Sequence, residues 1–430
     1  MSGPARATHH ASSKSAVLDV IRAAGTISRV GLINATGFTG ATISTVVRKL
    51  IDEGLVVETG RAESTGGKRR VLLQLNHSSR YAVGVHLDHA GITYVLTNLG
   101  GSVVARISRA GAGAAEPRTV VTRMATEVKG LIDGVGVDHN RVLGLGLVSP
   151  GPLSSDTGMG LTPPSMRKWE DFPLARELEQ ATGLPVVLDN DATAAALGEH
   201  WSGGIGGTAV SAALYMGTGI GAGLVINGVT YRGSSGNAGE IGHVCVDANG
   251  PECWCGARGC VEVLAGPAAV VAAARADAAL ARSAGLTGRA KSVSSDFAAV
   301  SRAARRGEPS ALAILERSAR YIAVAARTLA NIMDLEVLVL TGPSFAIAGS
   351  VYLPVVRDEL DRAFFSRAAH GIDVRLSRSA ATASAIGGAA LVLQSELVPL
   401  HEGLRLPENL ADSEPAALPE PIGEPTTRGA

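Results

Sequence analysis

Four residues in the second half of the chain have the types and spacing of a metal site. His243 is followed by Cys253, Cys255 and Cys260 in the pattern His-x9-Cys-x-Cys-x4-Cys. Three thiolates and one imidazole suit tetrahedral zinc, and four protein ligands leave no open position for a catalytic water. The pattern therefore predicts a structural zinc site that holds a loop in place. Disulfides or buried free thiols are the alternative, which a long chain without a secretory signal does not favour, and the remaining Cys245 is expected in a buried strand.

Two further segments carry groups that can bind hydroxyls. Glu240 precedes His243 by three residues, so on a helical turn the two side chains share a face, and both can meet a ligand while one ring nitrogen holds the metal. The segment Asp189-Asn190-Asp191 follows a predicted strand and precedes an alanine-rich helix. Asp191 is interpreted either as the N-cap of that helix or as a general base that takes a proton from a sugar hydroxyl. In the second case Asn190 holds a neighbouring hydroxyl.

A strand, a tight glycine turn and a second strand occur twice in the chain. The turns are 88–91 and 217–221, and helical segments follow each copy. The repeat predicts two similar α/β lobes with a cleft between them and the turns facing each other across it. Backbone amides at such turns suit phosphate oxygens, although Gly-Thr-Gly-Ile-Gly is equally consistent with an ordinary hairpin. The candidate phosphate-binding positions are Asp88, Gly91, Gly217, Thr218, Gly219 and Gly221.

The first 80 residues are basic, with 11 Lys and Arg against 5 Asp and Glu, whereas the whole chain has no net charge. Helical periodicity over residues 14–24, 26–36 and from Thr39 onward is followed by two predicted strands, 55–57 and 71–75, with a basic loop between them. This order predicts a winged helix-turn-helix whose third helix enters the major groove of DNA. The candidate DNA-binding residues are Thr39, Ala41, Thr42, Thr45 and Arg48 of the third helix and Lys68, Arg69 and Arg70 of the wing. A three-helix protein-interaction module with a solvated charge run is the alternative.

Length and composition bound the remaining possibilities. A chain of 430 residues with 46% hydrophobic and 18% charged residues is long enough for two or three globular domains. No apolar run is long enough to cross a membrane, and residues 1–13 have no hydrophobic signal core, so we expect a cytoplasmic protein. The small polar residues of 1–13 and the Pro-, Glu- and Ala-rich residues 404–430 are expected to be disordered.

The Gly-Glu-x-Gly-His segment, the Cys-x-Cys-Gly-x-x-Gly-Cys-x-Glu loop and the Asp-Asn-Asp segment together resemble the ROK family of repressors, open reading frames and sugar kinases. The resemblance spans roughly residues 14–396 and implies a two-lobed α/β body with an actin-like ATPase (ribonuclease H-like) fold. A winged helix-turn-helix ahead of that body resembles the sugar-responsive transcription repressors of the family, since its stand-alone kinases lack this head.

The resemblance also implies roles for individual residues. Sugar-binding positions of the family match Asn190, Asp191, Glu240 and His243, with Pro150 and Gly151 lining the pocket. Asp191 matches the catalytic base of the kinases, and His243 with the three cysteines matches the zinc ligands. Glu262 ends the signature and is interpreted as structural. Trp254 is expected to stack on a sugar face or simply to pack against its neighbours.

Departures from the kinase pattern favour a regulator. The first phosphate loop of the kinases reads Asp-x-Gly-Gly-Thr, whereas this chain has Ala90 and Ile92 in place of the first glycine and the threonine. A Cβ and a branched side chain are expected to crowd the γ-phosphate and its magnesium. The glycine run that packs against adenosine in the kinases is replaced by Thr-Gly-Pro-Ser-Phe, in which Phe345 is expected to intrude. ATP and Mg²⁺ are therefore not expected as cofactors.

The domains predicted from these patterns are a winged helix-turn-helix at 14–76, a first lobe at 81–200 plus 380–400, and a second lobe with the zinc loop at 201–379. We expect a sugar-responsive repressor of carbohydrate-metabolism genes that binds operator DNA as a homodimer or tetramer. Sugar binding would close the lobes and shift operator affinity. An ATP-dependent sugar kinase with a DNA-binding head is the alternative, and a regulator whose effector is a protein or a sugar phosphate is a third possibility.

Overall fold

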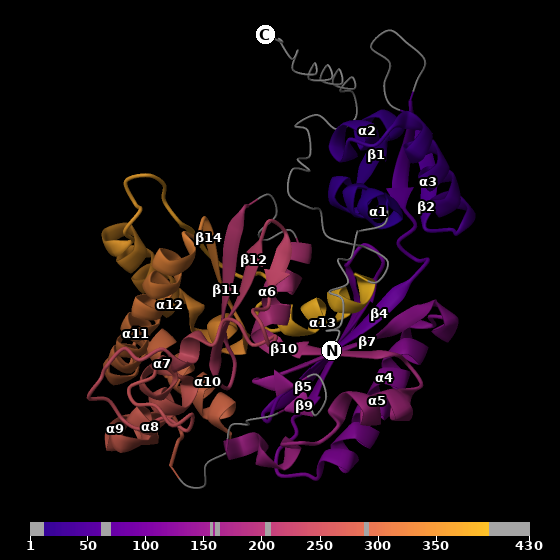
Figure 1. Ribbon diagram of the computed structural model, residues 1–430. Coiled ribbons are helices and arrows are strands. Elements are labelled where there is room, and N and C mark those ends of the chain that lie inside the picture. Colours follow the sequence, from indigo (N-terminus) through magenta and orange to yellow (C-terminus); the bar gives the residue numbers. More distant parts are fainter. Residues whose placement is uncertain are drawn as a thin grey trace, which may run out of the picture. The chain divides into compact units, whose positions relative to one another are not determined.

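The computed structural model describes residues 13–61, 70–154, 158–159, 164–202, 208–287 and 292–394. The chain divides into two compact units, and the boundary between them in the described sequence lies between Asn76 and His77. Figure 1 shows the elements of both units. Within the described residues no single helix is long and apolar enough to cross a membrane. The bent helix pair Arg29–Thr36 with Gly40–Asp52 has the length and composition of a membrane span, but no other feature of one.

The N-terminal unit packs three helices against a small antiparallel sheet of order β1-β3-β2. Its elements are α1 (Ser13–Ala24), β1 (Thr26–Ser28), α2 (Arg29–Thr36), α3 (Gly40–Asp52), β2 (Val56–Arg61) and β3 (Val71–Leu75). Ser28 caps α2 through its side chain, which is why the second helix begins at Arg29 and the residues before it form a strand instead. The Thr39 hydroxyl accepts the amide proton of Thr42 at the start of α3, as its position after Gly37 suggests.

The first lobe of the larger unit has a five-stranded sheet of order β10-β7-β4-β5-β6. Its strands are β4 (Tyr81–Leu87), β5 (Gly91–Asn98), β6 (Val103–Ala110), β7 (Val142–Ser149) and β10 (Val186–Asn190). Its helices are α4 (Pro117–Val135), α5 (Leu174–Thr182), α6 (Asp191–Trp201) and α13 (Ala383–Leu393). The apolar side of α4 and α5 forms one core with the sheet, and α13 covers the other face of β4 and β7.

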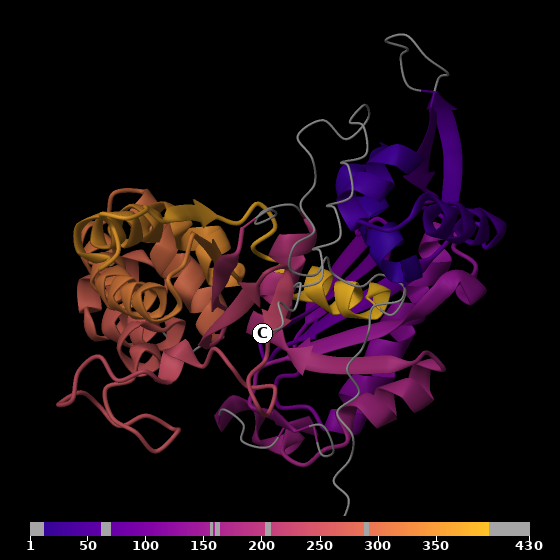
Figure 2. The same ribbon diagram turned by 45° about the horizontal axis from the view of Figure 1, so that its top comes forward.

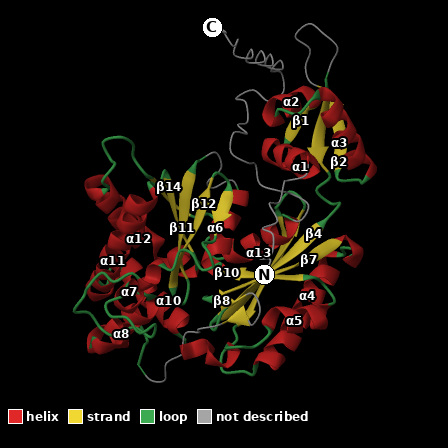
Figure 3. Cartoon of the chain, in the orientation of Figure 1, coloured by secondary structure: helices red, strands yellow, loops and turns green. Residues whose placement is uncertain are grey.

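The second lobe repeats this arrangement with a sheet of order β13-β12-β11-β14-β15. Its strands are β11 (Val210–Met216), β12 (Ile220–Ile226), β13 (Val229–Tyr231), β14 (Val337–Thr341) and β15 (Asp373–Leu376). Its helices are α7 (Val261–Ala265), α8 (Pro267–Ala276), α9 (Ala278–Ser283), α10 (Val293–Arg305), α11 (Pro309–Met333) and α12 (Pro343–Ala363). In both lobes an antiparallel meander of three strands is extended by two parallel strands, and helices flank the sheets (Figure 3).

Small residues allow the C-terminal helix α13 to pack closely on the first lobe. A Cβ on Gly387 would lie 1.7 Å from the carbonyl oxygen of Ala194 in α6, and one on Gly146 in β7 would lie 1.7 Å from that of Gly388. No side chain fits at these positions, so the glycines are required for α13 to lie directly on α6 and the first sheet. Figure 2 shows this helix in yellow beside the strands of the first lobe. The chain therefore returns to its first lobe after completing the second.

Candidate functional site

A cavity of about 610 Å³ lies between the two lobes of the larger unit. The first lobe contributes Asp88, Asn190 and Asp191 to its lining, and the second contributes Glu240 and His243. Polar residues from two segments of each lobe therefore meet at one cavity, although they are far apart in the sequence. This volume and this mixture of apolar walls with a few polar groups are typical of a small-molecule site.

Asn190, and not Asp191, is the N-cap of α6. The Asn190 Oδ1 accepts the amide protons of Ala192 and Thr193 at 2.8 and 3.0 Å. The interpretation of Asp191 as the cap is therefore wrong, because a cap residue precedes the helix and Asp191 is its first helical residue. The Nδ2 of Asn190 is turned toward the loop at Gly151, since a Cβ there would lie 2.8 Å from it. That amide group stays available as a donor at the cavity wall.

Glu240 is the N-cap residue of a short 3-10 turn, Ile241–His243, so it precedes the helical turn on which the two side chains were expected to share a face. Burial, followed by the nearby charges of Asp191 and Glu262, raises the pKa of Glu240 to about 7. The Oε1 of Glu240 also approaches Gly151, at 3.2 Å from the position of a Cβ. Glu240 thus shares the cavity with other carboxyl groups, among them Asp191 and Glu262, which present acceptors for hydroxyl donors.

Glu262 and Trp254 form a hydrogen-bonded pair in the same lining. The Glu262 carboxylate accepts the backbone amide of Ile220 at 2.9 Å and the Nε1–H of Trp254 at 2.8 Å. These bonds fit the structural role inferred for Glu262, but both residues also line the cavity. The Trp254 ring packs edge-on against His243, with ring centres 5.0 Å apart, which favours packing over stacking on a sugar. In the sequence, only the position of Glu262 at the end of the cysteine motif indicated that it could lie at this cavity.

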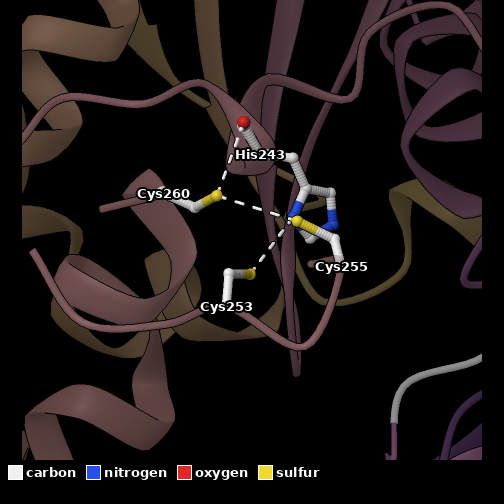
Figure 4. A group of neighbouring side chains, drawn as sticks. All are labelled: His243, Cys253, Cys255 and Cys260. Carbon is white, nitrogen blue, oxygen red and sulfur yellow. Dashed lines mark hydrogen bonds between the residues drawn. The ribbon is translucent and has the colours of Figure 1, made fainter. Parts of the chain in front are cut away.

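The four predicted metal ligands converge, as Figure 4 shows. Their ligand atoms all lie within 4.8 Å of one another, so the cluster can hold a metal ion. The Sγ atoms of Cys255 and Cys260 are 3.8 Å apart, and the Sγ of Cys253 is 3.6 Å from Nδ1 of His243. Zinc–sulfur bonds of about 2.3 Å place two ligands of a tetrahedron roughly 3.8 Å apart. The donor set and its spacing are therefore compatible with zinc. Cys245, by contrast, is exposed, and its predicted burial is wrong.

The two glycine turns meet across the cleft. The hydroxyl of Thr218 donates to Oδ2 of Asp88 at 2.6 Å, and both residues line the cavity with Gly219, Gly221 and Ala90. Gly217 and Gly91 belong to the same two turns, where they close the hairpins through backbone bonds. The turns thus face each other as their positions in the repeat predicted.

Two of the side chains expected to block a nucleotide point elsewhere. Ile92 is fully buried in the core of the first lobe, and Phe345 is buried in the second, edge-on to Tyr352. The crowding argument is therefore wrong for Ile92 and Phe345 and applies only to Ala90. The sequence motif could not reveal this. Adjacent strand residues alternate between faces, and β5 is buried on both, so the core position of Ile92 was hidden. Phe345 lies in α12, and only the tertiary packing decides which side of that helix meets the core. The residue before Phe345 contacts the second glycine turn, because the hydroxyl of Ser344 donates to the carbonyl oxygen of Gly217 at 3.0 Å. This bond connects the start of α12 to that turn.

His86 was not predicted and is the closest partner of Asp191. Its Nε2 lies 3.4 Å from Oδ2 of Asp191 and 3.4 Å from the hydroxyl of Tyr215. Burial by itself lowers the pKa of His86, but the hydrogen bond to Asp191 and the charges of Asp191 and Asp88 outweigh it, so the pKa is raised. A single histidine in the apolar strand β4 was the only sequence signal. The pair places a titratable imidazole directly beside the Asp191 carboxyl group.

The His86–Asp191 pair predicts a pH-dependent stability. Because the pKa of His86 is higher in the folded chain than in the unfolded one, the stabilisation is fully present below pH 6.5 and is lost as the pH rises through the folded pKa. His86→Gln keeps a donor but does not titrate. The difference in free energy of unfolding between wild type and His86→Gln, measured with urea from pH 6 to 9, should therefore shrink as pH rises. A difference independent of pH would contradict the pairing.

The candidate DNA-binding residues lie on one unit. Thr39, Ala41, Thr45 and Arg48 are exposed around α3, and Thr42 is half-buried, with its hydroxyl 2.9 Å from that of Thr39. Arg70 is half-buried before β3, while Lys68 and Arg69 lie outside the described residues. The inward side of α3 is formed by Ile43, Val47 and Leu50. The helix thus presents a polar surface that its own domain does not cover.

Two α/β lobes of the same strand order, with paired glycine turns at a cleft, define the predicted actin-like ATPase fold, which is confirmed. The chain belongs to the ROK family, whose model matches residues 83–395. A xylose repressor of Caldicellulosiruptor bescii is 30% identical over 377 residues, which are 86% of this chain and 92% of that protein. A glucokinase of Halalkalibacterium halodurans is 32% identical over 333 residues, which are 74% of this chain and 97% of that protein.

A solved structure extends the similarity to a regulator. The ROK family transcriptional regulator described as a homologue of the E. coli MLC protein has a TM-score of 0.70 and 25% identity to this chain. The match covers 89% of this chain and 95% of that one. The kinase is matched almost completely yet leaves a quarter of this chain without a counterpart, whereas the regulators extend further along it. The chain is therefore a member of the ROK family, and its similarity to the regulators of that family covers more of its length than its similarity to the kinase.

Proposed function

We propose that this protein is a sugar-responsive transcriptional repressor, in which the two-lobed body binds the effector and the N-terminal unit binds operator DNA. The observation that carries the proposal is the similarity to a xylose repressor over 92% of that protein's length. The helix-turn-helix with its exposed α3 surface supports the DNA-binding half. A homodimer would present two such units to a two-fold operator, and the protein would act in the cytoplasm, where the operator is.

The cavity supports a polyol as effector. The Nδ2 of Asn190 would donate to one hydroxyl, and the carboxylates of Asp191 and Glu240 would accept from others. His243 would offer Nε2, because its Nδ1 is turned to the cysteine sulfurs. Pro150 and Gly151 would close the pocket from the first lobe. Zinc held by His243 and the three cysteines would fix the loop that carries this imidazole and would supply no chemistry of its own.

Phosphoryl transfer is the activity we expect the protein to lack. The Oδ2 of Asp191 lies 3.4 Å from Nε2 of His86, so this carboxyl oxygen already has a partner and is less available to a substrate hydroxyl. The Cβ of Ala90 lines the cavity at the first turn, and Ser344 binds the backbone of the second. ATP and Mg²⁺ are therefore not part of the proposal.

A sugar-panel thermal-shift screen with and without ATP tests the effector half, and a gel shift on DNA upstream of sugar-utilisation genes tests the other. The effector sugar should raise the melting temperature of the protein without ATP, and it should release the protein from the DNA. Operator binding that ignores every sugar in the panel would remove the effector from the proposal.

The DNA-binding helix gives a specific variant. Arg48→Ala removes an exposed cation from α3 and should weaken operator binding by about tenfold, since one base or phosphate contact contributes about 1–3 kcal/mol. Gel shifts at constant salt measure this. Arg305→Ala, which removes the same charge from α10 of the other unit, is the control and should bind like wild type. Equal affinities of all three proteins would rule out α3 as the recognition helix.

A sugar kinase is the second candidate, favoured by the cavity position of Asp191 and by the nearly complete match to a glucokinase. A coupled assay of ADP release with a panel of hexoses distinguishes the two. Turnover that Asp191→Asn abolishes would assign the kinase activity.

A further inference from the structure

A side-chain amide joins the two lobes next to the cavity. The backbone N–H of Leu153, in β8 (Leu153–Ser154) of the first lobe, donates to Oδ1 of Asn237 at 2.7 Å. The Nδ2 of Asn237, on the segment leading to Glu240 of the second lobe, donates to the carbonyl oxygen of Leu153 at 3.0 Å. One amide thus satisfies both backbone groups of one residue, as a neighbouring strand would. The same Nδ2 also donates to the carbonyl oxygen of Ser235 at 3.2 Å, which fixes the orientation of the amide.

An ion pair crosses between the lobes on the same segment. Arg232, which follows β13 of the second lobe, donates through Nε and Nη2 to Oδ2 of Asp189 at 3.3 and 2.8 Å. Asp189 belongs to β10 of the first lobe, and its other oxygen accepts the backbone amide of Asn190 at 2.9 Å. The carboxylate is nearly buried, whereas Arg232 is about one-third exposed. Asp189, the neighbour of Asn190 in the first lobe, is therefore bound by Arg232 of the second lobe.

The two contacts act on one short segment, 232–240, because the amide of Ala238 donates to the carbonyl oxygen of Arg232 at 3.2 Å. This segment ends at Glu240. Gly151 lies where the contacts meet, since a Cβ on it would be 2.8 Å from Nδ2 of Asn190, 3.2 Å from Oε1 of Glu240 and 3.7 Å from Oδ1 of Asn237. Separation of the lobes would therefore break the Asn237 contact and move Glu240 away from Asn190.

We infer that Asn237, assisted by Arg232, is a positioning residue that clamps the lobes in the arrangement able to bind the effector. The inference rests on the proposed sugar-responsive function. Asn237 does not itself line the cavity, so it acts through the loop of Gly151 and the position of Glu240. A ligand that binds only the closed arrangement has an affinity reduced by the fraction of molecules that are open. The clamp thus sets the sugar concentration at which the repressor responds.

Asn237→Ala in the full-length chain tests the clamp. Loss of the two hydrogen bonds that cross between the lobes should weaken the binding of D-xylose or D-glucose, measured by calorimetry, by roughly tenfold. The sugar concentration that releases half of the operator DNA should rise by the same factor, while zinc content stays unchanged. Asn140→Ala, at an exposed asparagine of the first lobe, is the matched control and should behave like wild type. Unaltered sugar binding by Asn237→Ala would overturn the inference.

Hydrogen exchange without sugar gives a readout that does not depend on the proposed function. The amide of Leu153 is protected by Asn237 and should exchange at least about tenfold faster in Asn237→Ala than in wild type or Asn140→Ala. Equal exchange in all three proteins would overturn the clamp. If neither sugar binds the wild type while Leu153 exchange still depends on Asn237, the clamp stands and the choice of effector in the proposed function is what fails.

Discussion

Cys255→Ser is expected to remove the bound metal and, with it, the response to sugar. The residue supplies one of four ligand atoms that lie within 4.8 Å of one another, and a tetrahedral zinc site that loses a thiolate loses most of its affinity. Zinc contributes on the order of 10 kcal/mol to the folding of small zinc domains. Here it would hold a loop whose regular backbone pairing, among the described residues, is limited to the single bridges Cys245–Cys260 and Glu252–Arg258. Turn hydrogen bonds also shape this loop, but the metal would be the one group that joins His243 to all three cysteines.

The effect should reach the cavity because His243 belongs to both sites. Its ring faces the sulfurs through Nδ1 and also lines the cavity, three residues after Glu240. Loss of one hydrogen bond to a charged group costs about 1.5–3 kcal/mol, so displacement of His243 and Glu240 should weaken sugar binding by about 100-fold or more. Metal analysis of the purified chain and calorimetry with the effector sugar measure the two consequences.

Cys245→Ser is the control for this variant. Cys245 is exposed and lies outside the cluster, so its replacement should leave both the metal content and sugar binding as in wild type. A Cys255→Ser protein that retains a full equivalent of zinc would show that the metal is bound elsewhere.

Gly151→Ala is expected to weaken sugar binding by about 100-fold while leaving the fold of each lobe intact. The added Cβ would lie 2.8 Å from Nδ2 of Asn190 and 3.2 Å from Oε1 of Glu240, both closer than ordinary contact. Asn190 cannot yield easily, because its Oδ1 caps α6 through two backbone amides. Glu240 must therefore move, or the lobes must separate. Loss of a carboxylate contact together with an amide contact corresponds to binding weaker by about 100-fold.

A matched glycine on the same lobe provides the control. Gly130 lies within α4, where nothing is within 4 Å of an added Cβ. Gly130→Ala should stabilise the chain by about 0.5–1 kcal/mol through the helix and leave sugar binding unchanged. Thermal unfolding and calorimetry on both variants separate stability from binding. Sugar binding by Gly151→Ala that equals that of Gly130→Ala would place the ligand away from this loop.

The parts predicted correctly from the sequence were those decided by local chemistry. The metal cluster is such a case, since four ligands occur within 18 residues and their types and spacing leave few arrangements. The strand–turn–strand repeat was also visible, because glycine turns between apolar strands are local features, and both copies form the predicted hairpins. The capping of α3 by Thr39 could also be predicted, because it depends only on residues next to the start of the helix.

The tertiary structure decided which way individual side chains point and which distant segments meet. Both faces of the central strands are buried, so alternation in the sequence does not reveal that Ile92 lies in a core and His86 faces Asp191. The bonds between Asn237 and Leu153 join residues 84 positions apart, on different lobes. Such contacts exist only after both lobes have folded and packed together, because no local preference of either segment favours the other. The sequence by itself therefore determined the candidate metal-binding cluster and the repeated hairpins, and the packing of the lobes determined the cavity and the contact between Asn237 and Leu153.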